Sequence, residues 1–169
     1  GMVLRSLFLG TAKELKWAFY DAPSIFKPSL IKDLNITLKN RIDENPIKKL
    51  GELLESPDLR IASIGAELWQ EYEKNLSSIK SFDYNFKAIL NKKESNRERY
   101  TKAPNTPFIE NHYIKNTFFL KENQLIKNKN CLKEIPISII QGEYELLCPP
   151  INSFLFSKNL SNIKLIIAE

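Results

Sequence analysis

Short apolar runs near both ends of the chain predict β-strands. The first run ends at Gly10, the second follows Pro136 and ends at Gly142, and the third lies close to the C-terminus. Continuous apolar runs bounded by turn-forming residues are typical of strands that are buried on both faces of a parallel sheet. The predicted strands span residues 3–9, 137–142 and 164–168.

The middle of the chain has the periodicity of helices. Apolar residues recur there with helical spacing, and Pro28, Pro46 and Pro57 stand where this spacing begins. Asp58 is a predicted N-cap for the longest of these helices. The polar segment 91–106, which ends near two prolines, is expected to be a loop. The predicted helices span residues 12–20, 28–39, 46–55, 58–76, 82–92 and 107–119.

The order of these elements predicts an α/β fold. A helix opened by Pro149 and Pro150 separates the last two strands, and a strand–helix–strand unit forms a right-handed crossover with parallel strands. The helical middle is then a large insertion between the first two strands. We divide the chain into a core strand (residues 1–11), a helical region (12–131) and a C-terminal strand–helix–strand unit (132–169).

Composition and charge exclude several functional classes. A chain of 169 residues with 43% hydrophobic and 27% charged residues has enough apolar surface for the core of one domain. Its net charge of +5 is spread among acids instead of forming a basic arm, so nucleic-acid binding is not expected. Apolar runs of membrane-spanning length and a signal-peptide pattern are both lacking, so we expect no membrane partner and a cytoplasmic location.

The residue types for metal, cofactor or nucleophile chemistry are scarce. Two cysteines and one histidine are too few for a metal cluster. The five glycines are far apart, which excludes a phosphate-binding loop, a dinucleotide fingerprint and a G-x-S-x-G nucleophile elbow within this sequence. We therefore expect no metal, no cofactor and no complete active site of a common type.

Several short motifs together resemble a known family. Residues 109–113 read I-E-N-H-Y, and further motifs follow at fixed spacing: Phe118-Phe119, Gln124-Leu125, Ile135-Pro136 and Gly142-x-Tyr144-x-x-x-Cys148-Pro149. Upstream stand Val3 to Phe8, Trp17, Phe26-x-Pro28 and Trp69-x-x-Tyr72-Glu73. This series resembles proline iminopeptidases, α/β-hydrolase serine peptidases that remove N-terminal proline from peptides. The resemblance implies a truncated α/β-hydrolase: residues 12–131 as a mostly helical cap domain, and a remnant parallel sheet of about three strands.

The resemblance also implies a substrate-binding site. Glu73 and Glu110 correspond to two family glutamates that bind the protonated amino end of the substrate, although both could instead be surface or capping residues. Two carboxylates suit one secondary ammonium group, which donates two hydrogen bonds. Phe8 and Cys148 match positions that border the family's pyrrolidine pocket, and each would equally pass as a core residue. Ala18, Tyr72 and Glu143 depart from the family's pattern, so substrate preference could differ.

The catalytic groups of the family are only partly represented. Glu145 stands where the family carries the triad aspartate, and we interpret it as a vestigial triad acid. His112 matches a residue of the cap, and its spacing from Phe108 and Phe119 predicts aromatic packing. In the family the oxyanion loop and nucleophilic serine precede the matching region and the catalytic histidine follows it. This chain alone is therefore expected to be inactive, because nucleophile, base and oxyanion donors are lost together.

Two functions remain open at this stage. The chain could be a peptidase fragment, completed by a separately encoded nucleophile domain or left by a decayed gene, with N-terminal proline peptides as the ancestral substrate. It could instead be a non-catalytic binding or assembly module built on the cap. Whether it acts as an enzyme is thus left undecided by the sequence.

The first predicted strand suggests a mode of assembly. In the α/β-hydrolase order its outer edge would pair with the strand that leads to the nucleophile. Without that strand, backbone groups and the apolar residues Val3, Leu4, Leu7 and Phe8 would be left uncovered. We expect a homodimer joined through residues 3–9 of two copies.

Overall fold

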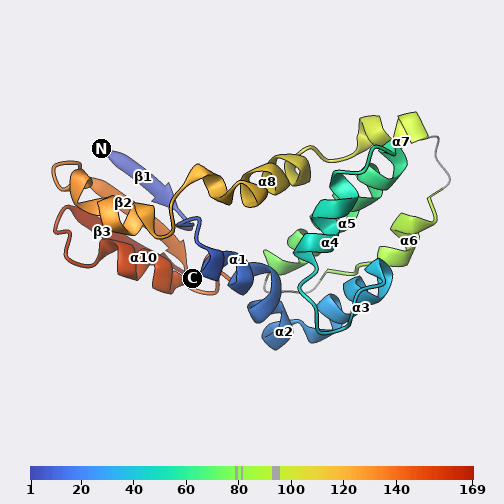
Figure 1. The fold of residues 1–169 in the computed structure, drawn as a ribbon. Coiled ribbons are helices and arrows are strands. Elements are labelled where there is room, and N and C mark those ends of the chain that lie inside the picture. Colours follow the sequence, from blue (N-terminus) through green and yellow to red (C-terminus); the bar gives the residue numbers. More distant parts are fainter. Residues whose placement is uncertain (79, 81, 93–95) are drawn as a thin grey trace.

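The computed structural model describes residues 1–78, 80, 82–92 and 96–169 and divides them into two lobes (Figure 1). One lobe holds the three strands with the helix labelled α10, and the other is helical. The segments labelled α1 and α8 lie between the lobes. The strands come from the two ends of the chain and the helical lobe from its middle, as the sequence pattern predicts. The boundaries at residues 11 and 131 remain predictions.

The three strands form one parallel sheet. They are β1 (Met2–Arg5), β2 (Ile137–Gly142) and β3 (Ile163–Ala168), in the order β1-β2-β3. Met2 is paired with Ile137 and Ile137 with Ile163. The α/β fold class with a small parallel sheet is thereby confirmed.

The first strand is shorter than predicted. Ser6 takes a positive φ of 46°, which turns the backbone out of the extended conformation, so the strand ends at Arg5 instead of residue 9. Leu4 and Leu7 pack against the core of the strand lobe, so the expectation that both are uncovered was wrong. Val3 is 71% exposed.

One face of the sheet carries the core of this lobe. Ile137 and Ile139 of β2 are buried against Leu9 and Phe156, the latter on helix α10 (Pro150–Ser157). Burial of these apolar groups is the main stabilising contribution here. Gln141 is also fully buried, and its amide is paired because it donates to the Cys148 carbonyl and accepts from the Ser153 hydroxyl.

The helical lobe is built around one long helix, α5. Its residues Trp69 and Tyr72 are fully buried, and Trp69 contacts the Phe19 ring edge-on at 5.7 Å. Helix α4 approaches α5 at Gly65, where an added Cβ would lie 2.7 Å from the Cβ of Leu53. The helical elements are α1 (Ala12–Lys16), η1 (Trp17–Asp21), α2 (Ala22–Phe26), α3 (Pro28–Leu38), α4 (Ile47–Leu54), α5 (Leu59–Leu76), α6 (Phe86–Leu90), α7 (Asn96–Lys102), α8 (Thr106–Lys115), η2 (Thr117–Phe119), α9 (Gln124–Asn128) and η3 (Lys129–Leu132).

Several predicted helix boundaries need correction. Residues 91–106 were expected to form a loop, yet they contain α7, whose Lys102 pairs with Glu98 one turn earlier. This helix has no continuous apolar stripe and is stabilised in part by paired charges. A search for hydrophobic periodicity therefore does not detect it. The part of the predicted loop at 93–95 lies outside the described residues. The helix expected at 107–119 ends at Lys115, because residues 117–119 turn left-handed.

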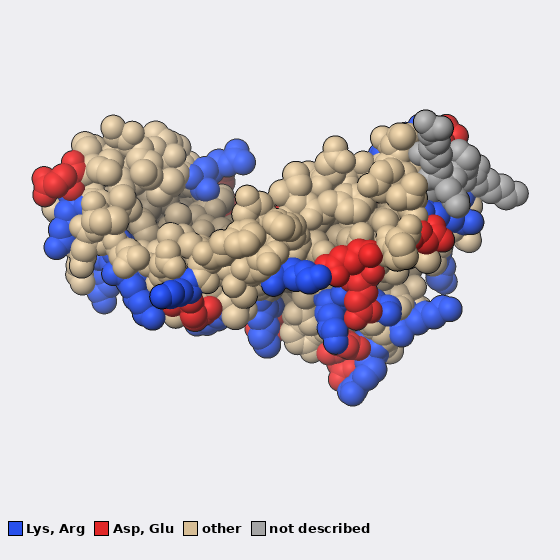
Figure 2. Space-filling view, turned by 45° about the horizontal axis from the view of Figure 1, so that its top comes forward, with Lys and Arg blue, Asp and Glu red and all other residues tan. Residues whose placement is uncertain are grey.

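The structure supports the interpretation of the charge pattern. On the face drawn in Figure 2, lysine and arginine side chains are interspersed with acidic ones. Among the described residues no helix combines the length and the apolar character needed to cross a membrane.

Candidate functional site

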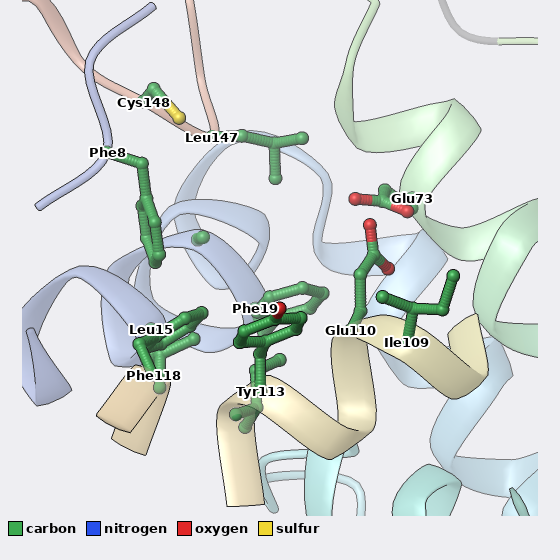
Figure 3. A pocket seen from close by; sticks show the side chains of 12 residues that line it. Phe8, Leu15, Phe19, Glu73, Ile109, Glu110, Tyr113, Phe118, Leu147 and Cys148 are labelled. Atoms are coloured by element: carbon green, nitrogen blue, oxygen red, sulfur yellow. The ribbon is translucent and has the colours of Figure 1, made fainter. Parts of the chain in front are cut away.

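A cavity of about 380 Å³ lies where the two lobes meet (Figure 3). Four of the five site residues singled out in the sequence line it: Phe8, Glu73, Glu110 and Cys148. They come from the segment after β1, from α5, from α8 and from the loop after β2. The fold thus brings together residues that lie up to 140 positions apart (148 minus 8).

Glu73 and Glu110 form the polar part of the cavity. Their carboxyl groups point toward each other (Figure 3), although 37 positions separate them in the sequence (110 minus 73). Glu110 accepts a hydrogen bond of 2.8 Å from the indole Nε1 of Trp69, which fixes its side chain from the α5 side. In the described part of the chain, neither carboxylate forms an ion pair with a lysine, arginine or histidine.

The surroundings of this pair favour retention of a proton. Burial raises the pKa of Glu73 to about 7, and the negative charge of Glu110 and a hydrogen bond between the two carboxyl groups add to the effect. Burial also raises the pKa of Glu110, against the opposing effect of the Trp69 hydrogen bond. Near neutral pH the Glu73 carboxyl therefore retains a proton in part of the molecules, and the pair carries less negative charge than two free carboxylates. A cation entering the cavity would replace that proton.

The remaining wall of the cavity is largely apolar and aromatic. The Phe8 and Phe118 rings meet edge to face with their centroids 5.2 Å apart. Cys148 is part of this wall, and burial, followed by the charges of Glu145, Glu14 and Glu73, raises the pKa of its thiol to about 12. The thiol is therefore protonated at neutral pH and acts as a neutral surface, because a nucleophilic cysteine requires the thiolate.

Glu145 lies outside this cavity. It lines a separate cleft of about 430 Å³ together with Trp17 and Phe26, and its carboxylate accepts a 3.3 Å hydrogen bond from the Ser6 hydroxyl. Ser6 follows β1 and Glu145 follows β2, so both stand at the carboxyl edge of the parallel sheet. Functional groups of open α/β sheets gather at this edge.

His112 lines neither the cavity nor the Glu145 cleft and contacts aromatic rings instead. On α8 its imidazole lies 5.8 Å from the Tyr113 ring and 5.7 Å from the Phe119 ring, between centroids. The contact with Phe119 agrees with the aromatic packing predicted from its spacing. Its ring lines a different, shallow groove beside Glu55 and Lys115.

Sequence reasoning missed Glu14, which positions the Phe8 segment. This buried carboxylate accepts hydrogen bonds from the backbone amides of Leu9 and Thr11 and from the side-chain amide of Asn152. It thereby ties the end of the β1 segment to α1 and to α10. The Thr11-x-x-Glu14 spacing of a capping box was the available signal, and the structure contains that box.

Comparisons with known proteins point to one family. No family model matches the chain. It is 27% identical over 163 residues to a proline iminopeptidase of Arabidopsis thaliana, a match that covers 91% of this chain and 39% of that protein. It is 28% identical over 168 residues to a probable proline iminopeptidase of Leptolyngbya boryana, covering 99% of this chain and 50% of the relative. A proline iminopeptidase of Xylella fastidiosa is 28% identical over 155 residues, with coverages of 90% and 47%.

These matches extend over most of the chain, and they agree with the series of motifs found in the sequence. The chain spans about half the length of the curated relatives that it matches, or somewhat less. Together these observations show that the chain is similar to proline iminopeptidases over most of its length.

Proposed function

We propose that this chain is the cap and C-terminal core part of a proline iminopeptidase-like serine aminopeptidase. Its cavity holds the first residue of a peptide, with the free amino group between Glu73 and Glu110. The observation that carries the proposal is the buried pair of carboxyl groups, which opens into an apolar cavity and forms no ion pair within the described residues. An ammonium group supplies the charge and the hydrogen-bond donors that such a pair requires.

The apolar wall supports the same proposal. Between the carboxyl pair and the aromatic end, Leu147 and the neutral Cys148 offer a surface that suits an aliphatic ring such as that of proline. A small number of polar groups that fix orientation within an apolar pocket is the usual plan of small-molecule sites.

Binding of a proline amide tests this assignment. Prolinamide, titrated into the labelled chain and followed by nuclear magnetic resonance, is expected to shift the signals of cavity residues. Glu110→Gln should weaken binding about tenfold or more, because hydrogen bonds to charged groups contribute about 1.5–3 kcal/mol. Glu52→Gln, which changes an exposed acid on α4, is the control and should bind normally. Equal affinity of wild type and Glu110→Gln would refute the ammonium site.

We further propose that the chain by itself does not hydrolyse peptides. Its 169 residues contain no G-x-S-x-G motif. Its one histidine lines a groove other than the cleft that contains Glu145, which we regard as a vestigial triad acid. The alternative is a non-catalytic role as a binding or assembly module. The cavity is compatible with this alternative, because binding of an amine requires neither a nucleophile nor a catalytic base.

The purified chain should accordingly release no proline from proline anilides above the buffer rate. Hydrolysis is measured by anilide absorbance with and without a serine-directed inhibitor. Activity that a serine-directed inhibitor removes, but that persists in Glu145→Ala, would come from a contaminating peptidase. Activity lost in Glu145→Ala would contradict the proposal.

Partners and location follow from the same proposal. The edge of β1 that is unpaired among the described residues offers a place for a strand. That strand would come from a separately encoded nucleophile domain or from a second copy, in a homodimer joined through residues 3–9. A cytoplasmic location suits Cys131 and Cys148, which are both free thiols.

A further inference from the structure

The turn after α8 has an unusual backbone. Thr117, Phe118 and Phe119 follow one another with φ values of 48°, 55° and 55°. Left-handed backbone is disfavoured for residues with a side chain, and three such residues in succession are rare outside glycine-rich turns. Strain of this kind persists only where surrounding contacts hold it, and it often marks a functional site.

Hydrogen bonds hold this turn in place. The amide of Phe119 donates to the Asn116 carbonyl at 2.9 Å, and that of Leu120 donates to the Thr117 carbonyl at 3.0 Å. The Asn116 side chain donates to the His112 carbonyl, which anchors the turn to the end of α8.

The turn sends its two phenylalanine rings to different sides. Phe119 is 64% exposed and packs on His112 and Tyr113. Phe118 lines the cavity and contacts Phe8. It also packs directly on the backbone of Gly10, because a Cβ added there would lie 3.3 Å from the Phe118 ring.

This arrangement gives the cavity two unlike ends. Phe8, Phe118 and Leu15 lie together on one side in Figure 3, and the carboxyl groups of Glu73 and Glu110 lie on the other. The volume of about 380 Å³ is typical of pockets for drug-sized ligands, which are far larger than one prolyl residue. A prolyl residue bound at the carboxyl pair therefore leaves the aromatic end unfilled.

From these observations we infer that Phe118 is a specificity-determining residue, held by its left-handed turn, and that the aromatic end receives a large apolar side chain. The ligand class is an amine whose cationic nitrogen lies at the carboxyl pair and whose aromatic or branched aliphatic group reaches Phe8 and Phe118. This inference rests on the proposed ammonium site and adds a preference for residues larger than proline.

The test compares two amides on the full 169-residue chain. Phenylalaninamide and prolinamide are titrated separately, and the ratio of their dissociation constants is measured for each variant. Wild type is expected to bind phenylalaninamide more tightly. Phe118→Ala should weaken phenylalaninamide about fivefold while changing prolinamide less than about twofold, the range expected for one aromatic contact.

Two further variants separate function from folding. Phe119→Ala alters the neighbouring ring on the outer side of the turn, and it should leave the ratio unchanged. Phe118→Gly removes the ring but suits the left-handed backbone, so it should lose the preference without a large fall in the unfolding temperature. A marked fall in unfolding temperature, with the ratio unchanged, would assign Phe118 a structural role and overturn the inference.

The result also distinguishes the two proposals. If Glu110→Gln weakens both amides but Phe118→Ala leaves their ratio unchanged, the ammonium site stands and the aromatic subsite is refuted. If Glu110→Gln changes neither amide, the ammonium site itself fails.

Discussion

Glu73 illustrates how one side chain links stability to binding. It lies on the face of α5 that packs, where an ionised carboxylate without a cation is unfavourable. The helix tolerates it because the carboxyl group retains a proton and hydrogen bonds with Glu110. The residue therefore costs stability when the site is empty and ionised, and a bound cation removes that cost.

The stability of the chain should therefore depend on pH through Glu73. Because its folded pKa is raised from 4.5 to about 7, the folded state holds more protons than the unfolded state between these values. The contribution is fully present below about pH 4.5 and is lost as pH rises to about 7. Glu73→Gln should remove this dependence and exceed wild type at pH 8 by about 1–2 kcal/mol, allowing for partial solvent screening.

Urea denaturation at a series of pH values measures this effect. The difference between variant and wild type should shrink toward acidic pH. A difference that is independent of pH would mean that folding does not shift the pKa of Glu73. Glu71→Gln, on the same helix, is a suitable control.

At the scale of single residues, the sequence reveals chemistry better than conformation. A carboxylate on an otherwise apolar helix face is visible in the sequence, and so Glu73 could be singled out. Phe118 was visible only as part of a family motif, and its place in the cavity could not be predicted. That place depends on left-handed backbone, and Thr-Phe-Phe contains no glycine or asparagine that would indicate such a conformation. The pairing of Glu73 with Glu110 depended on the family resemblance, since tertiary contacts bring α5 and α8 together.

Among the helices, strong apolar periodicity made prediction reliable. The limits of α3, α4 and α5 lie within one residue of the predicted ones, because prolines or Asp58 mark their beginnings. The short helix α7 was missed, since it has no apolar face long enough to show a period. Residues 12–26 continue as helix through the π-helical turn η1, a change in hydrogen bonding that side-chain spacing does not reveal.

The end of α3 offers a test at the scale of an element. Lys39 closes this helix in the left-handed region, with φ of 57°, and its amide donates to the carbonyls of Asn35 and Ile36. Glycine adopts this conformation without steric cost, so Lys39→Gly should stabilise the protein by about 0.5–1 kcal/mol. Lys39→Ala keeps the Cβ and should have little effect. The free energy of unfolding of both variants is measured by thermal or urea denaturation. A lower stability of Lys39→Gly than of wild type would contradict the prediction.

At the scale of the whole molecule, β1 forms one edge of the three-stranded sheet that the structure describes. Within the described residues β1 pairs only with β2. The amides of Met2 and Ser6 donate toward β2, so the alternate residues Val3 and Arg5 direct their backbone groups away from it. This edge is short and carries two exposed apolar side chains, those of Met2 and Val3.

If two copies pair through this edge, light scattering should give about twice the mass of 19.6 kDa. Val3→Pro should then yield a folded monomer, because proline removes an outward amide and spares the bonds to β2. Proline at Leu4 or Leu7 would not test this edge, because Leu4 alternates toward β2 and Leu7 lies beyond the strand. Val3→Ala is the control and should remain dimeric. A wild-type monomer at micromolar concentration would refute the homodimer.

The pairing of β1 with β2 also has a consequence for the order of events during synthesis. Met2 is paired with Ile137, so 135 positions separate the two partners (137 minus 2). During synthesis β1 is made before β2, so this pairing cannot form until β2 has been made. Closing so long a loop is an entropic cost that the local contacts of the helices do not incur. The helical lobe can therefore form before β1 has paired with β2.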